Sequence, residues 1–172
     1  MLGGGRKLAN ELGEPLYAVV VGSGLSKAFA DEAIAFGADK VYLVDDPLLK
    51  TYETDAYLAV MEKVAKEVKP QVVLIGQTAL GRDLAPRLAF RLATTATLDC
   101  VEVSLDPASK RLLQTKPVYG GNAQAIFVTE TNPQIATIRV KTMRRIRLSC
   151  RKICQGEAAP SATGLDKFGK GR

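Results

Sequence analysis

The sequence predicts a single α/β domain in which a mostly parallel sheet lies between helical layers and late antiparallel strands follow. Three observations support this fold class. Before residue 95, short apolar runs alternate with longer segments in which apolar residues recur every three or four positions, the patterns of strands and helices. The early strands are apolar throughout, which indicates burial on both faces of a parallel sheet. After residue 95, strand-like segments follow one another between turn signals, as in antiparallel hairpins.

Three strands and three helices are expected between residues 16 and 95. The strands are expected at 16–21, 40–44 and 72–75, and the helices at 25–36, 54–69 and 80–92. Gly37 and Pro70 end the first two helices, and Thr54 is expected to cap the second. Because a helix follows each strand across a short joint, these elements form the parallel part of the sheet.

The strand-like segments after residue 95 are expected to form hairpins that complete the sheet. They span 99–105, 111–117, 123–130 and 135–141, and turn signals at 106–107, 120–122 and 131–133 separate them. The sequence shows no internal repeat and no domain boundary before residue 144. We therefore expect one domain over residues 1–143 and a separate extension over 144–172.

The net charge of +6 belongs to the extension. Residues 1–143 contain 16 basic and 16 acidic side chains, whereas residues 144–172 contain eight basic and two acidic ones. A neutral domain has no net field that would attract nucleic acid, so no nucleic-acid partner is expected. Because the extension has no periodic apolar face, we expect it to be disordered; binding to an acidic surface is the alternative.

The composition excludes several classes of site. The sequence has no histidine and three cysteines, Cys100, Cys150 and Cys154, so neither a histidine-dependent catalytic pair nor a four-ligand zinc site can form. No apolar run is long enough to span a membrane, and the N-terminal residues do not resemble a signal peptide. We expect no catalytic residues, no metal site and no membrane span. The sparse cysteines suit a reducing compartment such as the cytoplasm.

Two junctions between a strand and a helix suit a nucleotide, because free backbone N–H groups and the helix dipole favour phosphate there. The first, 22–27, has neither Walker nor GxGxxG spacing, and a tight turn with Ser26 as helix cap is favoured over a phosphate loop. Asp45 and Asp46 after the next strand could hold a hard cation, but a turn before Pro47 is the favoured interpretation.

The second junction, 76–87, is richer in such signals. The candidate nucleotide-binding residues are Gly76, Gln77, Thr78, Gly81 and Arg82, because the glycines allow a sharp turn at the start of the helix. Two other interpretations stay open. Asp83, Arg87 and Arg91 form a polar stripe along this helix. The stripe is a subunit face, or it belongs to a capped helix with a solvated ion pair.

Three charged side chains define that stripe. Asp83 and Arg87 are four residues apart and Arg91 continues the same face, so an Asp83–Arg87 ion pair is expected. Pro86 has no N–H and is therefore expected in the first helical turn, which places the start of the helix near Gly81 or Arg82.

The segment GQTALGRDLAPRLAFRL at 76–92 resembles the GxTxxGRDLAPRxAxRL signature of electron-transfer flavoprotein alpha subunits. Three further stretches, 5–24, 116–127 and 133–143, agree with that family in order and spacing. The resemblance covers residues 3–143 and implies a three-layer Rossmann-like domain, related to the adenine-nucleotide alpha-hydrolase folds.

The resemblance implies an electron carrier rather than an enzyme. In this family an alpha–beta heterodimer passes electrons from flavin-dependent dehydrogenases to an acceptor, in the cytoplasm or, in a eukaryote, the mitochondrial matrix. Its FAD is bound by a C-terminal domain of the alpha subunit, so FAD is expected in the complete heterodimer and not on this chain alone. The alternative is a stand-alone adenine-nucleotide-binding protein that uses the turn at 76–82.

The beta subunit is the implied partner, and four residues are expected at interfaces. They are Arg82, Arg87, Tyr119 and Asn122. Arg82 and Arg87 lie on the helix that carries the polar stripe, and Tyr119 precedes a Gly-Gly-Asn turn that can project it outward.

The chain departs from the family pattern at both ends. Only 29 residues follow residue 143, too few for the FAD domain, and the chain begins within the helix expected at 4–13, without the family's first buried strand. We therefore expect a fragment or truncated alpha subunit with a gap beside strand 16–21. Such an open edge predicts instability or self-association rather than a stable monomer, and insertion of residues 145–148 into the gap is a further outcome.

Overall fold

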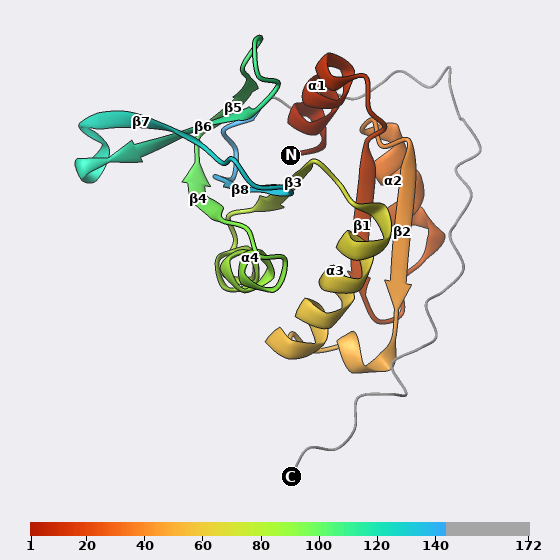
Figure 1. Cartoon of the computed structure of the whole chain (residues 1–172). Coiled ribbons are helices and arrows are strands. Elements are labelled where there is room, and N and C mark those ends of the chain that lie inside the picture. Colours follow the sequence, from red (N-terminus) through yellow and green to blue (C-terminus); the bar gives the residue numbers. More distant parts are fainter. Residues whose placement is uncertain (144–172) are drawn as a thin grey trace.

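The computed structural model describes residues 1–143 and shows the expected α/β domain (Figure 1). All helices and strands expected before residue 95 are present, with ends within two residues of those expected. The helices are α1 (Leu2–Leu12), α2 (Lys27–Ala35), α3 (Thr54–Val68) and α4 (Ala79–Arg91), with short 3-10 turns η1 (Pro47–Leu49) and η2 (Tyr119–Gly121). The strands are β1 (Tyr17–Gly22), β2 (Lys40–Asp45), β3 (Val72–Gly76), β4 (Ala96–Cys100), β5 (Glu102–Leu105), β6 (Leu112–Val118), β7 (Ala123–Val128) and β8 (Gln134–Ile138). The extension at 144–172, including residues 145–148, lies outside the described residues.

The parallel strands fall into two groups. β1 pairs with β2, and β8 lies between β3 and β4. β5, β6 and β7 form a separate antiparallel sheet. The expected combination of parallel pairing with late antiparallel strands is thus confirmed.

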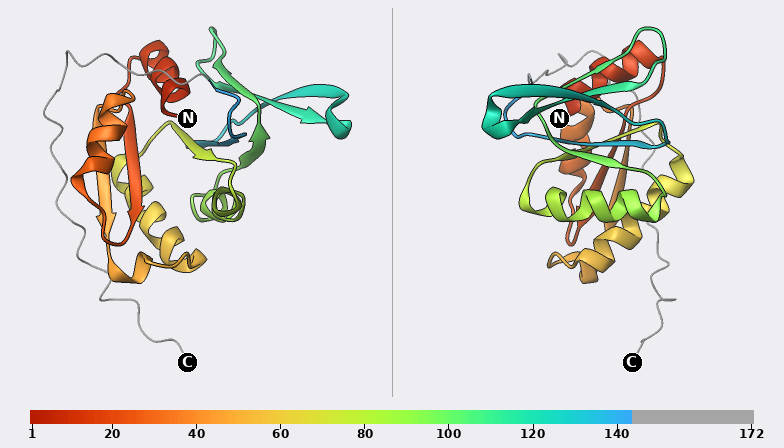
Figure 2. Two further views of the ribbon diagram at one scale, coloured as in Figure 1. Left: turned by 180° about the vertical axis from the view of Figure 1, so that it is seen from behind. Right: turned by 60° about the vertical axis from the view of Figure 1, so that its left-hand side comes forward.

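Successive side chains of each strand point to opposite faces of the sheet, so they pack against two different layers of helices. On β3, Val72 and Leu74 pack in a cluster with Leu8 of α1, whereas Val73 and Ile75 pack against α4. In the other group of parallel strands, α2 packs on one face of β1 and β2, and α3 packs on the other. The helices α1 and α2 therefore cover one face, and α3 and α4 cover the opposite one (Figure 2).

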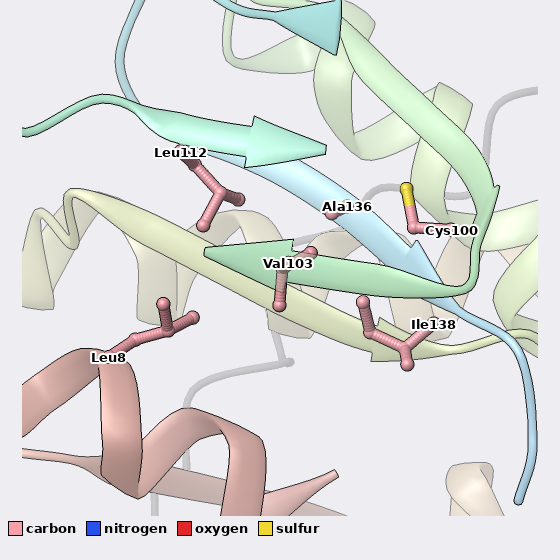
Figure 3. Close-up of a cluster of buried hydrophobic side chains, with 6 residues drawn as sticks. All are labelled: Leu8, Cys100, Val103, Leu112, Ala136 and Ile138. Carbon is pink, nitrogen blue, oxygen red and sulfur yellow. The ribbon is translucent and has the colours of Figure 1, made fainter. Parts of the chain in front are cut away.

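The cluster beneath α1 joins the parallel and antiparallel sheets. Its buried side chains come from α1, from the parallel strands β4 and β8, and from the antiparallel strands β5 and β6 (Figure 3). They are Leu8, Cys100, Val103, Leu112, Ala136 and Ile138. The antiparallel sheet is thus anchored to the body by burial of apolar side chains at its inner end.

Two expectations about the late strands are wrong. The segment expected as one strand over 99–105 forms two, because β4 ends at Cys100 and β5 begins at Glu102 with a different partner. Asp99 has a left-handed backbone with φ of 64°, and the register with β8 shifts between Thr97 and Cys100, as at a bulge. The last strand, β8, belongs to no hairpin; it is parallel, central, and buried at all five residues.

Helix α4 begins earlier than expected. Its first residue is Ala79 and its cap is Thr78, so Pro86 lies inside the helix rather than in the first turn. Because proline has no N–H, the carbonyl oxygen of Arg82 lacks its usual helical donor. Both Arg82 and Pro86 are exposed, so water can replace that donor.

One of the two expected helix caps is wrong, and the other is confirmed in its position. Thr54 is the first residue of α3 rather than its cap, because its hydroxyl donates instead to the Asp83 carboxylate (2.7 Å). Ser26 stands at the cap position of α2, but its side chain makes no capping hydrogen bond. The Thr54–Asp83 contact joins residues that are far apart in the sequence. The local pattern around Thr54 therefore could not predict it.

Strand β1 has an open edge, as expected. Within residues 1–143 its one strand partner is β2, and no ladder joins it to β3. The residues of β1 and β3 are mostly half-buried, whereas those of β8, which is paired on both sides, are buried. The N terminus lies between these two open edges (Figure 1).

Candidate functional site

The candidate nucleotide-binding residues lie at the carboxyl end of β3, where the chain enters α4. This is the end of a parallel strand at which α/β proteins place ligands. The Thr78 hydroxyl accepts a hydrogen bond from the Gly81 amide (3.2 Å) and so caps the helix. The Gln77 amide donates to the carbonyl of Ile138 on β8 (2.8 Å). These contacts are those of a capped helix joined to its sheet.

Gly81 has a packing role at this junction. A Cβ atom there would lie 1.9 Å from the carbonyl oxygen of Gly76, so no other residue allows α4 to lie this close to β3. A Cβ atom on Gly76 would meet its nearest neighbours at 3.9 Å, which is ordinary contact. Helix–strand packing therefore accounts for Gly81 without a ligand.

A chain of polar contacts crosses the carboxyl ends of β3, β8 and β4. The Thr137 hydroxyl donates to the side-chain oxygen of Gln77 and accepts from the Asp99 amide (2.8 Å). The Asp99 carboxylate accepts from Nε (2.9 Å) and Nη2 (2.7 Å) of Arg139. These hydrogen bonds from Arg139 hold the pKa of Asp99 below its usual value, and weaker attraction from Lys116 and Arg82 acts in the same direction.

The Asp83 carboxylate joins α4 to the segment before α3. It accepts hydrogen bonds from the hydroxyls of Thr54 (2.7 Å) and Tyr52 (2.8 Å) and from Nε of Arg87 (3.0 Å). These three bonds lower the pKa of Asp83, while burial and the bond to Asp83 raise the pKa of Tyr52. The expected Asp83–Arg87 ion pair is confirmed. The roles of Tyr52 and Thr54 were not expected, because they depend on the packing of α3 against α4.

The first junction does not hold a free phosphate loop. The amides of Gly24 and Leu25 donate to the two carboxylate oxygens of Asp45 (2.7 and 3.0 Å), which therefore takes the place of an anion. The Asp46 carboxylate accepts from the Leu48 amide (2.9 Å) and caps η1. The turn interpretation is confirmed at both places. Among residues 1–143, no acidic or cysteine side chains form a group that could hold a metal ion.

The four expected interface residues lie on two surfaces. Arg82 and Arg87 are exposed on α4, where Arg87 also pairs with Asp83. Tyr119 and Asn122 lie at the turn between β6 and β7, and the Tyr119 side chain is 84% exposed. This turn is the far end of a hairpin that projects from the body (Figures 1 and 2). The structure therefore does not bring the two pairs together.

The sequence analysis missed an exposed apolar strand beside that turn. Ile126, Phe127 and Val128 of β7 are all exposed. The available signal is that the strand-like residues 123–128 include no charged side chain. A fully buried strand has the same pattern, so this pattern alone does not separate the two cases.

A small cavity lies near the candidate nucleotide-binding residues. It lies beside the carboxyl ends of β3 and β8 and has a volume of about 220 Å³, which is smaller than the roughly 300–1,000 Å³ of typical ligand pockets. Its lining residues are Met1, Gly76, Ile138, Arg139, Val140, Lys141 and Met143. At the neighbouring turn, the Thr78 hydroxyl already engages the Gly81 amide.

The Cys100 thiol is buried, and its burial raises its pKa to about 11, so it stays protonated and unreactive near neutral pH. Within the described part of the chain, no helix combines the length and the hydrophobicity needed to cross a membrane.

Comparison with known sequences places the chain among electron-transfer components. A sequence model described as "Electron transfer flavoprotein domain" matches residues 1–163, which continues past the end of the described residues. The "Electron transfer flavoprotein subunit alpha" of Thermoanaerobacterium thermosaccharolyticum is 45% identical over 146 residues, covering 84% of this chain and 44% of the relative. The protein of the same name from Megasphaera elsdenii is 40% identical over 165 residues, covering 95% of this chain and 46% of the relative.

A relative with a dehydrogenase name also matches. The "Lactate dehydrogenase (NAD(+),ferredoxin) subunit LctC" of Acetobacterium woodii is 40% identical over 142 residues, covering 82% of this chain and 34% of the relative. The chain thus spans less than half the length of each of these curated relatives.

Proposed function

The chain belongs to the electron transfer flavoprotein family, and from this premise we propose that it serves as the scaffold and interface domain of an alpha-type subunit. In the complete complex with a beta subunit, electrons pass from flavin-dependent dehydrogenases to an acceptor. The observation that carries the proposal is the family match over residues 1–163, supported by relatives named as alpha subunits. We place the complex in the cytoplasm, or in the mitochondrial matrix of a eukaryote.

In this proposal the domain carries electrons only as part of the complex and catalyses no reaction of its own. FAD is bound outside residues 1–143. The contacts at the start of α4 support this division, because Gly81 is required by packing and the adjacent cavity of about 220 Å³ is small. The exposed arginines of α4 and the projecting Tyr119 leave surfaces free for a partner.

Titration with cofactors tests where the flavin binds. Purified protein is expected to be colourless and to bind FAD weakly or not at all, as followed by flavin absorbance and by calorimetry. Parallel titrations with ATP and AMP test the alternative of a nucleotide-binding protein, with Arg82→Ala as the variant that would weaken such binding. Stoichiometric flavin on the purified chain would contradict the proposal, and tight ATP or AMP binding would favour the alternative.

Assembly with a beta subunit tests the interface role of α4. The double variant Arg82→Ala/Arg87→Ala is expected to weaken the complex while leaving the melting temperature nearly unchanged, because both side chains are exposed. Lys7→Ala on α1, another exposed basic side chain, is the control. Equal assembly of the double variant and the wild type would exclude this face of α4 from the interface.

A further inference from the structure

Met143, the last described residue, packs against helix α1 after the chain leaves β8. We propose that Met143 is an oxidation-sensitive latch, at which a peroxide converts the thioether to the sulfoxide and releases residues 139–143 from α1. The family match continues to residue 163, so this segment connects the domain to the chain that follows. The inference concerns packing within this chain and goes beyond the proposed function.

Helix α1 provides a notch for the thioether. A Cβ atom on Gly4 would overlap Sδ of Met143 and lie 3.2 Å from its Cε atom, so the side chain lies directly on the backbone of α1. Met143 also packs against the buried cluster that contains Leu8 of α1 and Ile138 of β8. Its flexible thioether thus fills the space that the glycine leaves and covers apolar side chains.

A tight turn brings Met143 to this notch. Lys141 has a left-handed backbone with φ of 66°, and the Thr142 hydroxyl donates to the carbonyl of Arg139 (2.7 Å). A non-glycine residue in that region is strained unless the surrounding structure holds it there. Val140 is 56% exposed, and Lys141 and Thr142 are exposed as well, so the packing of Met143 is what holds the end of this segment on the body.

A small oxidant can reach the sulfur atom. Met143 is half-buried and lines the cavity of about 220 Å³ beside the carboxyl ends of β3 and β8. A water molecule occupies roughly 30 Å³, so the cavity has room for hydrogen peroxide. Met61 is also half-buried but packs in the cluster beneath α3 and α4, and Met1 is 52% exposed. Of the three methionines in the sequence, Met143 is therefore the one whose oxidation acts on residues 139–143.

Oxidation changes the side chain in a way that the notch does not accept. Hydrogen peroxide transfers one oxygen atom to Sδ of Met143: its O–O bond breaks, an S–O bond forms, the sulfur loses two electrons, and the peroxide leaves as water. The sulfoxide is polar, and a polar group among apolar side chains is unfavourable unless it is hydrogen-bonded. On the side of Gly4 there is also no room for an added atom. The oxidised side chain should therefore leave α1, and the turn should open.

Thermal melts and trypsin cleavage of peroxide-treated protein test the latch. The wild type is compared with Met143→Leu and Met61→Leu, because leucine keeps an apolar side chain of similar volume that cannot be oxidised. Mass spectrometry should show the sulfoxide at Met143 of the treated wild type. We expect the treated wild type and Met61→Leu to melt at least about 3 °C lower and to be cleaved after Lys141 at least about fivefold faster, whereas Met143→Leu should keep both values. Methionine sulfoxide reductase should restore the wild type.

Gly4→Ala tests the notch without oxidation. Alanine within a helix normally stabilises it relative to glycine, but here the added Cβ atom displaces Met143, so the untreated variant should be cleaved after Lys141 faster than the wild type. A higher melting temperature with unchanged cleavage would show that Met143 does not occupy the notch and overturn the inference. Equal losses in Met143→Leu and the wild type after treatment, or a Met143 sulfoxide that changes neither measurement, would overturn it too. So would a Met143 that stays unoxidised while Met1 and Met61 are oxidised.

Discussion

The strand β8 (QIATI) is no more apolar than β1 (YAVVVG), but it is more completely enclosed by its surroundings. β8 has a parallel partner on each side and is buried at all five residues. β1 pairs with β2 alone within residues 1–143, and most of its residues are half-buried. The number of neighbouring strands, rather than the apolar character of the strand itself, thus decides how far it is buried.

The largest expected effect is the gain in stability when an added strand fills the open edges of β1 and β3. Met1 lies beside Gly76, at the carboxyl end of β3, so a short loop and an apolar six-residue strand added before Met1 can enter between β1 and β3 in the parallel direction. Each apolar side chain buried there contributes roughly 1.5–3 kcal/mol, and the extension should stabilise the domain by at least about 5 kcal/mol. The melting temperature should rise by about 10 °C or more.

The control for this extension is a glycine–serine segment of the same length, which cannot bury apolar surface. Differential scanning calorimetry gives the melting temperatures, and sedimentation velocity follows self-association, which we expect for the short chain and not for the extended one. A short chain that is monomeric and melts as high as the extended one would show that the edges of β1 and β3 do not accept a strand.

Two isoleucines allow a matched comparison of closed and open strands. Ile135 of β8 and Ile75 of β3 pack in the same cluster, but Ile135 is fully buried and Ile75 is partly buried. We expect Ile135→Ala to cost about 3–4 kcal/mol and Ile75→Ala about 1–2 kcal/mol in urea unfolding. In the strand-extended protein, the cost of Ile75→Ala should approach that of Ile135→Ala. Equal costs in the short chain would contradict the comparison.

Alanine substitutions of Gly76 and Gly81, at the junction of β3 and α4, should change the stability by a smaller amount. Gly81→Ala places a Cβ atom 1.9 Å from the Gly76 carbonyl oxygen, so α4 must move away from β3, at an expected cost of about 2–3 kcal/mol. Gly76→Ala, where the nearest atoms lie at 3.9 Å, should cost under about 1 kcal/mol. Thermal melts of the two variants measure the difference. A larger loss for Gly76→Ala would indicate that close helix–strand packing is not the reason for Gly81.

Local patterns in the sequence were sufficient to predict the strands and helices that alternate before residue 95. The helix predicted at 54–69 from its apolar positions and from Pro70 is observed at Thr54–Val68, and Gly37 correctly indicated the end of α2. The central place of β8 was not predictable in this way. Its pairing with β3 and β4 depends on chain topology, and its apolar residues suit a hairpin as well as a buried parallel strand.

The candidate site was predictable to a similar degree. The Asp83–Arg87 pair follows from a spacing of four residues on one helix, and the outward position of Tyr119 follows from its turn. The hydrogen bonds from Tyr52 and Thr54 to Asp83 join segments about 30 residues apart. Such contacts exist only after α3 and α4 have packed together.

The smallest expected effect concerns the Asp99–Arg139 pair, which joins β4 to the end of β8. The folded-state pKa of Asp99 is lowered, so the pair stabilises the fold above the unfolded-state pKa of about 3.9, and this contribution is lost as pH falls through the lower folded-state value. Both side chains are partly exposed, so the contribution should stay under about 1 kcal/mol.

Asp99→Asn is the suitable variant, because asparagine tolerates the left-handed backbone at this position, where φ is 64°. In urea unfolding it should be less stable than the wild type at pH 6, and the difference should shrink as the pH falls below the unfolded-state pKa of about 3.9. Arg139→Gln should lose a similar amount at pH 6, whereas Asp31→Asn, an exposed carboxylate on α2, should change little. A difference between Asp99→Asn and the wild type that is constant from pH 6 to pH 2 would show that the side chain acts through hydrogen bonds that asparagine cannot replace, and not through its charge.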